Sequence, residues 1–419
     1  MVLIAVWIAA LGSQAFAKPD TLVVCPAPFR DALREWEAYR HAQGHEILVV
    51  DSPKSAAALQ QTIRQVGAAG GLKYVLLIGQ APSVRSMNDR PANTTVPTNY
   101  VTAKVNIRWG SDAHIATDIP FADLDGDNLP DVAIGRIPAS SPAQLVSVLR
   151  KSMNYERLTT HDAWERKLDI ASGNGNFGAV TDALIEAAAR QVITQCVPAE
   201  YVTQHICPAN INVGEGASAL GFAAMARQQL NEGSLAWVYL GHGWITELDR
   251  VPTLTGKGSE SILSVGDVTK LHCGGHSPLA VLVACYTGAM DAPQKCLANE
   301  LLMADEGPVA VIAATRVTMP YGNTVLGCEL LRACFRDRPE HLGDTLLLAE
   351  RKTLAPSSDD QLRTSLDSLA GGLSPMPVDL TSERQEHVMM YHLFGDPLLH
   401  LRRPVMNEAP LVDGASSSH

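Results

Sequence analysis

The sequence predicts an α/β protein built on parallel β-sheet. Short apolar segments of strand length alternate with longer amphipathic segments along most of the 419 residues. Strands that are apolar on both faces and separated by helices are typical of parallel βαβ units. Hydrophobic residues make up 46% and charged residues 18% of the chain, a mixture that excludes disorder along its whole length.

Residues 18–157 are expected to form a smaller N-terminal α/β subdomain. The strands predicted here are residues 21–25, 46–50, 73–79 and 131–136. The predicted helices are residues 29–43, 55–66 and 141–157. Residues 80–121 are rich in Pro, Asn and Thr, which predicts irregular structure. The long helix at 141–157 marks the boundary with the second subdomain.

Residues 158–403 repeat the α/β pattern and are expected to form a second, larger subdomain. The predicted strands are residues 167–171, 201–206, 235–240, 279–284 and 309–314. The predicted helices are residues 179–192, 217–231, 297–304 and 324–335. Residues 404–419 are small and polar, which predicts a disordered tail.

The net charge and the cysteine content restrict the possible functions. Lys and Arg number 33 against 44 Asp and Glu, so the formal net charge is −11. No basic excess is available to neutralise phosphates, and we therefore expect no nucleic-acid partner. Eight cysteines are too few for a disulfide scaffold. The pairs closest in sequence are Cys196 with Cys207 and Cys328 with Cys334, but spacing alone establishes neither.

Residues 1–17 have the features of a signal peptide. Residues 1–10 form an apolar run, which is too short for a membrane span of about 20 residues. Ala15 and Ala17 form the small-x-small pattern of a signal-peptidase site, so the mature chain would begin at Lys18. The alternative is a buried first strand of a cytosolic domain. We expect export, to the periplasm or the medium, and no integral membrane segment in the mature chain.

Two of the predicted strands end on reactive residues. One leads into Gly241-His242-Gly243, and the next leads into Cys285. Active sites of open parallel sheets form beyond the carboxyl ends of the strands, so neighbouring strands would bring His242 and Cys285 together. A thiol that attacks a carbonyl needs a base and then an acid for the leaving amine, and one imidazole supplies both. The Gly243 amide would help to bind an oxyanion.

Each of these residues has a simpler interpretation when it is taken alone. Free cysteine is among the most buried residue types, so Cys285 by itself predicts a core thiol. His242 by itself predicts an ordinary loop histidine. Their matching positions at two strand ends favour the catalytic interpretation.

Several sequence blocks resemble the gingipain family of cysteine peptidases, and they occur in the family's order from about residue 18 to residue 403. They are residues 74–79 (YVLLIG), 132–136 (VAIGR), 241–243 (GHG), 284–285 (AC), 307–315 (GPVAVIAAT) and 394–397 (FGDP), the last before a closing strand. The resemblance implies a caspase-like fold for the catalytic subdomain, residues 158–403. It also implies that Cys285 is the nucleophile and His242 the general acid and base. The oxyanion hole would then be formed by the backbone amides of Gly243 and Cys285.

The function implied by the resemblance is an exported cysteine endopeptidase. It would hydrolyse peptide bonds of protein or peptide substrates through the Cys285–His242 dyad, with a thioester acyl-enzyme and no organic cofactor. One departure concerns a glutamate that gingipains place near the histidine, because Asn174 stands in that region here. An asparagine can orient an imidazole, although it stabilises imidazolium less. The alternative is a weak or inactive relative that acts as a partner in protein processing or secretion, since the mature chain leaves no room for the family's pro-segment.

Residues 123–131 (DLDGDNLPD) predict a structural calcium site. Asp123, Asp125, Asp127 and Asp131 stand at loop positions 1, 3, 5 and 9, and the Leu129 carbonyl adds another oxygen. The acid that an EF-hand carries at position 12 is missing, so the loop is not an EF-hand. The alternative is an acidic solvated turn, but four aspartates this close repel one another without a cation.

Residues 173–178 match the Gly-x-Gly-x-x-Gly pattern of dinucleotide-binding loops. The acid that binds ribose should close a second strand about 20 residues later, yet Glu200 precedes the predicted strand. We interpret the loop as part of the active-site rim. A nucleotide-binding oxidoreductase is the third hypothesis for the chain.

Overall fold

The computed structural model describes residues 18–83, 93–173, 193–208, 221–253, 257–356, 360–373 and 379–404. The expected signal peptide, Asn174, the predicted helix 179–192 and residues 405–419 of the expected tail lie outside these ranges.

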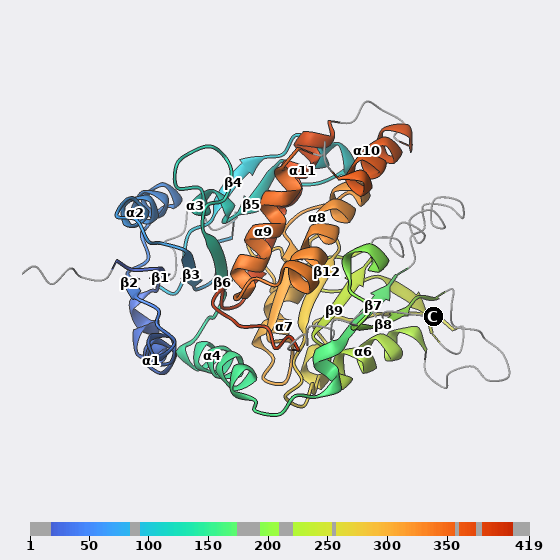
Figure 1. The fold of residues 1–419 in the computed structure, drawn as a ribbon, viewed down its shortest axis with the longest axis horizontal. Helices are drawn as coiled ribbons and strands as arrows, with labels where there is room; N and C mark the ends of the chain where they lie inside the picture. The colour runs from blue at the N-terminus through green and yellow to red at the C-terminus, as the bar shows by residue number, and fades with distance from the viewer. Residues whose placement is uncertain are drawn as a thin grey trace, which may run out of the picture.

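Ten strands of the described residues form one large sheet (Figure 1). Their order across the sheet is β2-β1-β3-β6-β14-β13-β12-β9-β7-β8. Their bounds are β1 Thr21–Val24, β2 Ile47–Val50, β3 Tyr74–Ile78, β6 Ala133–Ile137, β7 Lys167–Ser172, β8 Val202–Ile206, β9 Ala236–Leu240, β12 Leu279–Val283, β13 Ala310–Ala314 and β14 Tyr391–Phe394.

The sheet is mostly parallel, which confirms the predicted fold class. β1 pairs in parallel with β2 and β3, and β3 pairs in parallel with β6. β9 pairs in parallel with β7 and β12, and β12 with β13. β14 runs antiparallel to β13 and joins β6 through the pair Phe394 with Arg136. The strands of residues 18–157 and those of residues 158–403 therefore belong to one sheet. The two sets meet where β6 lies beside β14.

Helices cover both faces of this sheet. Because strand side chains alternate between faces, Val23 packs in one core with Trp36 and Leu145, whereas Val24 packs in another with Leu59. The first face is covered by α1 (Arg34–Ala42), α4 (Pro142–Arg157), α6 (Phe222–Glu232) and α7 (Leu297–Met303). The second face is covered by α2 (Ala56–Ala68), α8 (Pro320–Arg332), α9 (Leu342–Leu354) and α11 (Leu380–Met390), and α10 (Gln361–Leu373) contacts α8.

Residues 80–121 contain regular structure, so the predicted irregular segment is wrong in part. Two short strands, β4 (Asn99–Thr102) and β5 (His114–Thr117), pair antiparallel, and helix α3 (Ile119–Ala122) follows. β4 is not buried and carries polar residues at both ends, so it lacks the apolar run by which the sheet strands are found. A second hairpin of this kind, β10 (Arg250–Pro252) with β11 (Ser259–Ser261), follows β9.

The C-terminal region differs from expectation in the position of its strand. The closing strand was expected after the FGDP block, but β14 ends at Phe394 and the block follows it. The Asp396 side chain holds the chain in place after β14. It is buried and accepts hydrogen bonds from Trp36 Nε1 at 2.5 Å and from Arg40 Nη2 at 2.7 Å. Arg40 also pairs with Glu156 of α4 at 2.9 Å. This buried network joins α1, α4 and the segment after β14, and loss of one partner would leave a charge buried and unpaired.

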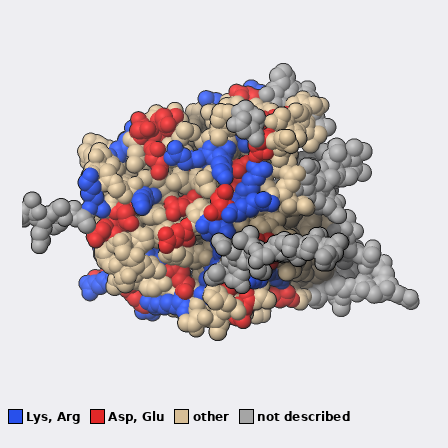
Figure 2. All heavy atoms as spheres, in the orientation of Figure 1, with Lys and Arg blue, Asp and Glu red and all other residues tan. Residues whose placement is uncertain are grey.

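Charges of both signs are mixed over the surface that Figure 2 shows, where Lys and Arg side chains lie between Asp and Glu side chains. None of the helices in the described part of the chain combines the length and the apolar character of a membrane span.

Candidate active site at the ends of β9 and β12

β9 and β12 are neighbouring parallel strands, and their last residues pair, Leu240 with Val283. The Gly241 amide continues the ladder by donating to the Val283 carbonyl at 3.2 Å. His242 and Cys285 each lie two residues beyond this last pair. The registered strands therefore place the imidazole-bearing loop and the thiol-bearing loop side by side at one edge of the sheet.

Gly243 is the point at which the two loops touch. A Cβ atom at this position would lie 2.9 Å from the Cys285 carbonyl oxygen and 2.8 Å from Thr287 Cγ2, which is closer than real Cβ atoms approach. Only glycine therefore lets the His242 loop pack against Cys285. Tyr286, which follows the thiol, has a φ of 58°, a left-handed conformation that is strained for a bulky residue.

The Cys285 thiol contacts the backbone and the side chain of Thr318. Cys285 is half-buried, whereas the other seven cysteines are buried. The Thr318 amide donates to Cys285 Sγ at 3.3 Å, and the Thr318 hydroxyl oxygen lies 3.7 Å from the same sulfur. Sγ also lies 3.8 Å from the Thr318 carbonyl oxygen, to which the thiol donates.

A chain of hydrogen bonds fixes the direction of the Thr318 hydroxyl. Tyr391 donates to Asn323 Oδ1 at 2.7 Å, so the Asn323 amide nitrogen is free to donate to Thr318 Oγ1, which it does at 2.9 Å. Since Thr318 Oγ1 accepts from Asn323, its own proton can point to Cys285 Sγ. Burial raises the pKa of Tyr391, which keeps the first donor of the chain protonated. Sequence reasoning missed all three residues, because they are distant from Cys285 along the chain and belong to no motif.

The segment that carries Thr318 rests on a buried histidine. His387 Nε2 accepts from the Met319 amide at 2.9 Å, and its Nδ1 lies 2.7 Å from the Glu383 carbonyl oxygen. This arrangement requires a neutral ring with its proton on Nδ1. Burial lowers the pKa of His387 to about 4, so the ring stays neutral at physiological pH.

Asp249 is a further acidic residue beside the histidine loop. The Asp249 amide donates to the His242 carbonyl at 3.1 Å, and Tyr239 donates to the same carbonyl at 3.0 Å. Asp249 Oδ1 accepts from the Arg250 amide at 2.7 Å, whereas Oδ2 is buried without a hydrogen-bond partner among the described residues. Oδ2 lies 3.5 Å from the position of a Cβ on Gly173, at the end of β7. Sequence reasoning missed Asp249, which belongs to no motif and has two other charged residues, Glu247 and Arg250, close to it in the sequence.

Asn174, the predicted orienter of the histidine, lies outside the described residues, as does the rest of the glycine-rich loop after Gly173. The predicted calcium loop is described in full. Asp123, Asp125 and Asp131 each bring a carboxylate oxygen within 4.8 Å of the others. That group does not include Asp127, which instead accepts from the Leu129 amide at 2.8 Å.

Two arginines lie near this acidic loop. Arg64 and Arg351 lie 3.8 Å from carboxylate oxygens of Asp123 and Asp131 respectively. The loop carboxylates also accept backbone hydrogen bonds, for example from the Gly126 amide to Asp123 at 2.6 Å. These groups balance part of the negative charge.

Among the cysteines, the structure brings together a pair that sequence proximity does not predict. Cys196 and Cys328 are buried, and their sulfur atoms lie 3.0 Å apart. The two pairs closest in sequence are therefore not the ones that the fold selects for these residues.

Comparisons with known proteins agree with this architecture. Residues 14–402 match peptidase family C25. No curated protein sequence is significantly similar to the chain. The structure is similar to that of the Arg-specific cysteine proteinase gingipain R (RgpB), with 19% identity, a TM-score of 0.63, and 92% of this chain and 78% of that chain covered. It is also similar to the complex of the Porphyromonas gingivalis RgpB pro- and mature domains, with 18% identity, a TM-score of 0.62, and coverage of 91% and 79%.

A third similar structure is described as a protease, with 16% identity, a TM-score of 0.64, and 92% of this chain and 79% of that chain covered. At these identities the structural likeness establishes the fold, and the family match establishes the relationship. The family match spans residues 14–402, which include all strands of the large sheet and the ends of β9 and β12. The chain therefore belongs to peptidase family C25, the gingipain family of cysteine peptidases.

Proposed function

We propose that this protein is an exported cysteine endopeptidase that hydrolyses peptide bonds with Cys285 as nucleophile and His242 as general acid and base. The observation that carries the proposal is the pairing of β9 with β12, which sets the two residues at one edge of the sheet. The hydrogen bond from the Thr318 amide to Cys285 Sγ supports it, because it holds the sulfur in position at this end of the sheet. The substrates are proteins or peptides, in keeping with the family.

In the proposed reaction, His242 takes the thiol proton and the Cys285 sulfur attacks the scissile carbonyl carbon. The oxyanion that forms is bound by the backbone amides of Gly243 and Cys285. When the C–N bond breaks, His242 gives its proton to the leaving amine and a thioester remains on Cys285. Water, deprotonated by His242, then attacks the thioester, and the carboxylic acid product leaves as the thiol re-forms.

We further propose that Asp249 takes part in orienting His242, in the role that a glutamate has in gingipains. Its buried carboxylate lies beside Gly173, next to the position where that glutamate is replaced by Asn174. Asp249 also contacts the His242 loop directly through its amide. Asn174 is the second candidate for this role, and single variants of the two residues separate them.

The nucleophile is tested with Cys285→Ala. We expect this variant to lose hydrolysis of a mixed peptide library and to lose labelling by iodoacetamide at that position, with an unchanged unfolding midpoint. The control is Cys25→Ala, because Cys25 is buried at the end of β1 and takes no part in the proposed chemistry. If the Cys285→Ala variant retained hydrolysis, the assignment would be wrong.

We propose a structural calcium ion for the loop of residues 123–131. The proposed ligands are carboxylates of Asp123, Asp125, Asp127 and Asp131 with the Leu129 carbonyl, and the clustering of three of them within 4.8 Å supports it. Calcium should raise the unfolding temperature of the wild type, and Asp125→Asn should weaken that effect. An equal shift in both proteins would exclude the loop as the site.

We also propose that the protein is exported and processed after Ala17, to the periplasm or the medium. The small-x-small pattern at Ala15 and Ala17 supports this. Sequencing the N-terminus of the protein from each cell fraction tests it. A mature N-terminus at Lys18 in the exported fraction is expected, and an unprocessed chain confined to the cytoplasm would contradict the proposal.

A further inference from the structure

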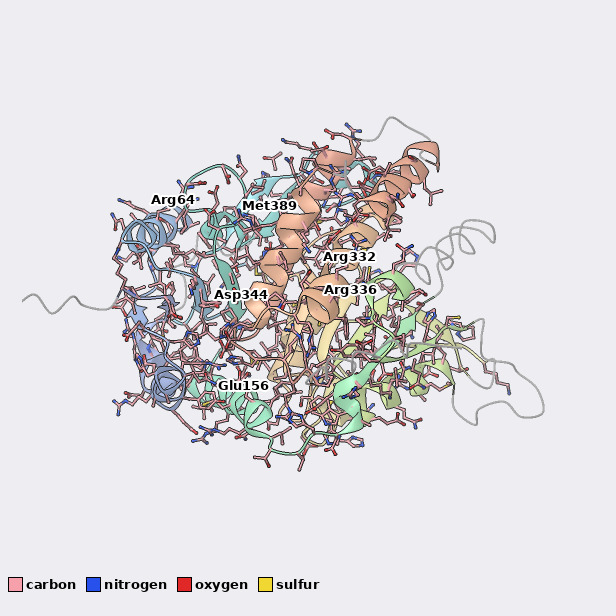
Figure 3. All side chains as sticks on the ribbon, viewed as in Figure 1. Arg64, Glu156, Arg332, Arg336, Asp344 and Met389 are labelled. Carbon is pink, nitrogen blue, oxygen red and sulfur yellow. The ribbon has the colours of Figure 1, made fainter. Side chains whose placement is uncertain are left out.

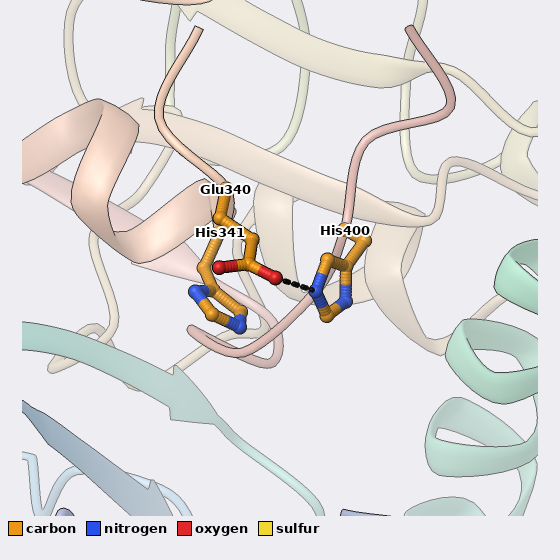
Figure 4. A group of neighbouring side chains, drawn as sticks. All are labelled: Glu340, His341 and His400. Carbon is orange, nitrogen blue, oxygen red and sulfur yellow. Dashed lines mark hydrogen bonds and ion pairs between the residues drawn. The ribbon is translucent and has the colours of Figure 1, made fainter. Parts of the chain in front are cut away.

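Glu340, His341 and His400 form a compact group (Figure 4). Glu340 and His341 directly precede α9, and His400 follows the end of β14. A backbone hydrogen bond from the Leu342 amide to the Leu399 carbonyl, at 2.8 Å, holds these two segments together. One potential ligand atom of each of the three side chains lies within 4.8 Å of the others.

This group lies at the opposite edge of the sheet from the candidate active site. β12 and β13 are parallel, so Cys285 lies beyond the end of β13 at which Ala314 pairs with Tyr391. β14 runs the other way and ends at Phe394. His400, which comes after Phe394, therefore lies at the other edge, and the group is no part of the proposed catalytic machinery.

His341 presents a buried nitrogen that lacks a partner. Its side chain is only 7% exposed, and Nε2 is buried with no hydrogen-bond partner among the described residues. Nδ1 lies 2.9 Å from the Tyr74 hydroxyl oxygen and 3.2 Å from Asp344 Oδ2. Tyr74 gives its own proton to Asp344 at 2.8 Å, so Nδ1 must carry the ring proton and donate. Nε2 is then left with a buried lone pair that accepts no hydrogen bond from the described part of the chain.

His400 is held in a similar way. Its Nδ1 lies 3.5 Å from Glu156 Oε1, and its amide donates to the same oxygen at 2.8 Å. With Nδ1 turned to Glu156, Nε2 faces Glu340 Oε1 at 3.3 Å. Figure 3 labels the two supporting carboxylates, Glu156 on α4 and Asp344 on α9.

We propose that Glu340, His341 and His400 bind a divalent zinc ion, with water as the fourth ligand. Two imidazole nitrogens and one carboxylate are a donor set typical of zinc. Tetrahedral bonds of 2.0–2.1 Å place neighbouring ligand atoms about 3.3 Å apart, which is the distance between His400 Nε2 and Glu340 Oε1.

The surroundings of the three ligands support this site in two ways. Each histidine has a carboxylate on its Nδ1 side, Asp344 for His341 and Glu156 for His400, and such partners orient metal-binding histidines. The Glu340 side chain is 73% exposed, so a hydrated ion can reach the site from solvent. His45 packs edge-on against His341 but is paired with Asp20 at 2.9 Å, which leaves it outside the ligand set.

The metal would join the start of α9 to the segment after β14. That segment contains Asp396, which is buried and paired with Arg40. Bound zinc would therefore stabilise the packing of the C-terminal part of the described chain against the sheet. Binding to the folded state alone raises its stability by mass action. The inference does not depend on the proposed peptidase activity.

The test uses the tag-free full chain carrying Cys285→Ala, which removes the thiolate as a competing ligand. After removal of metal with a chelator, titration with zinc chloride should show one tight equivalent and a raised unfolding temperature. Cobalt(II) should bind with the visible absorption of a four-coordinate site. His272→Ala is the control, because His272 is exposed elsewhere on the surface.

We expect His400→Ala to weaken zinc binding by roughly a hundredfold or more, and Asp344→Asn, which changes only a supporting residue, by roughly tenfold. Glu340→Gln alters an exposed side chain, so it tests the site even if the histidine variants fail to fold. A zinc affinity and cobalt spectrum unchanged in Glu340→Gln and His400→Ala would overturn the proposal, as would the absence of any zinc binding by the parent protein.

Discussion

The backbone amide of Thr318 donates a hydrogen bond to Cys285 Sγ at 3.3 Å, across 33 residues of sequence. Thr318 follows β13, the strand beside β12, so two neighbouring strand ends supply the thiol and a donor for it. The hydroxyl of the same residue is directed at the sulfur through Asn323 and Tyr391. The backbone and the side chain of one residue therefore fix the position of the thiol, with the Thr318 amide as donor and the Thr318 carbonyl oxygen, 3.8 Å away, as acceptor.

Replacing Thr318 by Val removes the hydroxyl and keeps the backbone amide. A hydrogen bond to a charged group contributes about 1.5–3 kcal/mol, so we expect kcat/KM to fall roughly tenfold or more. The rate of iodoacetamide labelling at Cys285 should be lower than in the wild type. Thr324→Val is the matched control, since the hydroxyl of Thr324 bonds to the Pro320 carbonyl on α8. A labelling rate identical to the wild type would show that the hydroxyl does not act on the thiol.

Replacing Asp249 by Asn tests the proposed orienter of His242. The variant keeps the size of the side chain and the amide contact to His242, but it loses the charge that would stabilise imidazolium. We expect kcat to fall roughly tenfold or more with KM little changed, because general acid–base assistance depends on the histidine. Glu247→Gln is the control, as Glu247 is a nearby acid that pairs with Arg250 at 3.0 Å. If only Asn174→Ala impaired kcat, the role would belong to Asn174.

Stability should fall as the pH is lowered from about 6.5 to about 4. Burial lowers the pKa of His387 from 6.5 to about 4, so in this window the unfolded chain binds a proton that the folded chain does not. The contribution of neutral His387 to the free energy of unfolding is therefore fully present above pH 6.5. Acidification removes it, and the free energy of unfolding falls by up to roughly 3 kcal/mol. Protonation would also break the bond to the Met319 amide next to Thr318.

The measurement is the free energy of unfolding in urea at pH 7 and pH 5. His387→Gln keeps an acceptor and a donor without a titrating group, so its stability should depend less on pH than that of the wild type. His272→Gln, on the surface, should behave like the wild type. Equal pH dependence in the wild type and His387→Gln would refute the assignment.

Cys196 and Cys328 should form a disulfide when the protein is treated with oxidised glutathione. Their sulfurs lie 3.0 Å apart, and the hydrogen bond from Cys328 lowers the pKa of the Cys196 thiol, which favours the attacking thiolate. The two thiols lose two hydrogens as one oxidised glutathione becomes two reduced ones. Closing so long a loop would stabilise the fold by roughly 4 kcal/mol.

Mass spectrometry of the Cys285→Ala protein after proteolysis should find the Cys196–Cys328 peptide pair, with a raised unfolding temperature before digestion. Cys328→Ser should lose both effects, and Cys207→Ser should keep them. Detection of Cys196 linked to Cys207 instead would contradict the geometry.

The sequence by itself determined the fold class, most of the sheet strands and the reactive residues at two strand ends. Buried parallel strands are apolar throughout, and that signal is local, so β3, β12 and β13 can be found to within a residue or two. The order of blocks also led to the family. The short polar strands β4 and β10 and the place of β14 carry no such signal, because they are defined by pairing with distant residues.

Only the tertiary structure decided which residues surround the reactive ones. The Thr318 contact to Cys285, the carboxylate of Asp249 beside Gly173, and the meeting of His341 with His400 each join segments that are distant in sequence. Such contacts arise from sheet order and helix packing, and no periodicity in the chain records them. The reactive residues are therefore visible in the sequence, whereas the groups that contact them are visible only in the fold.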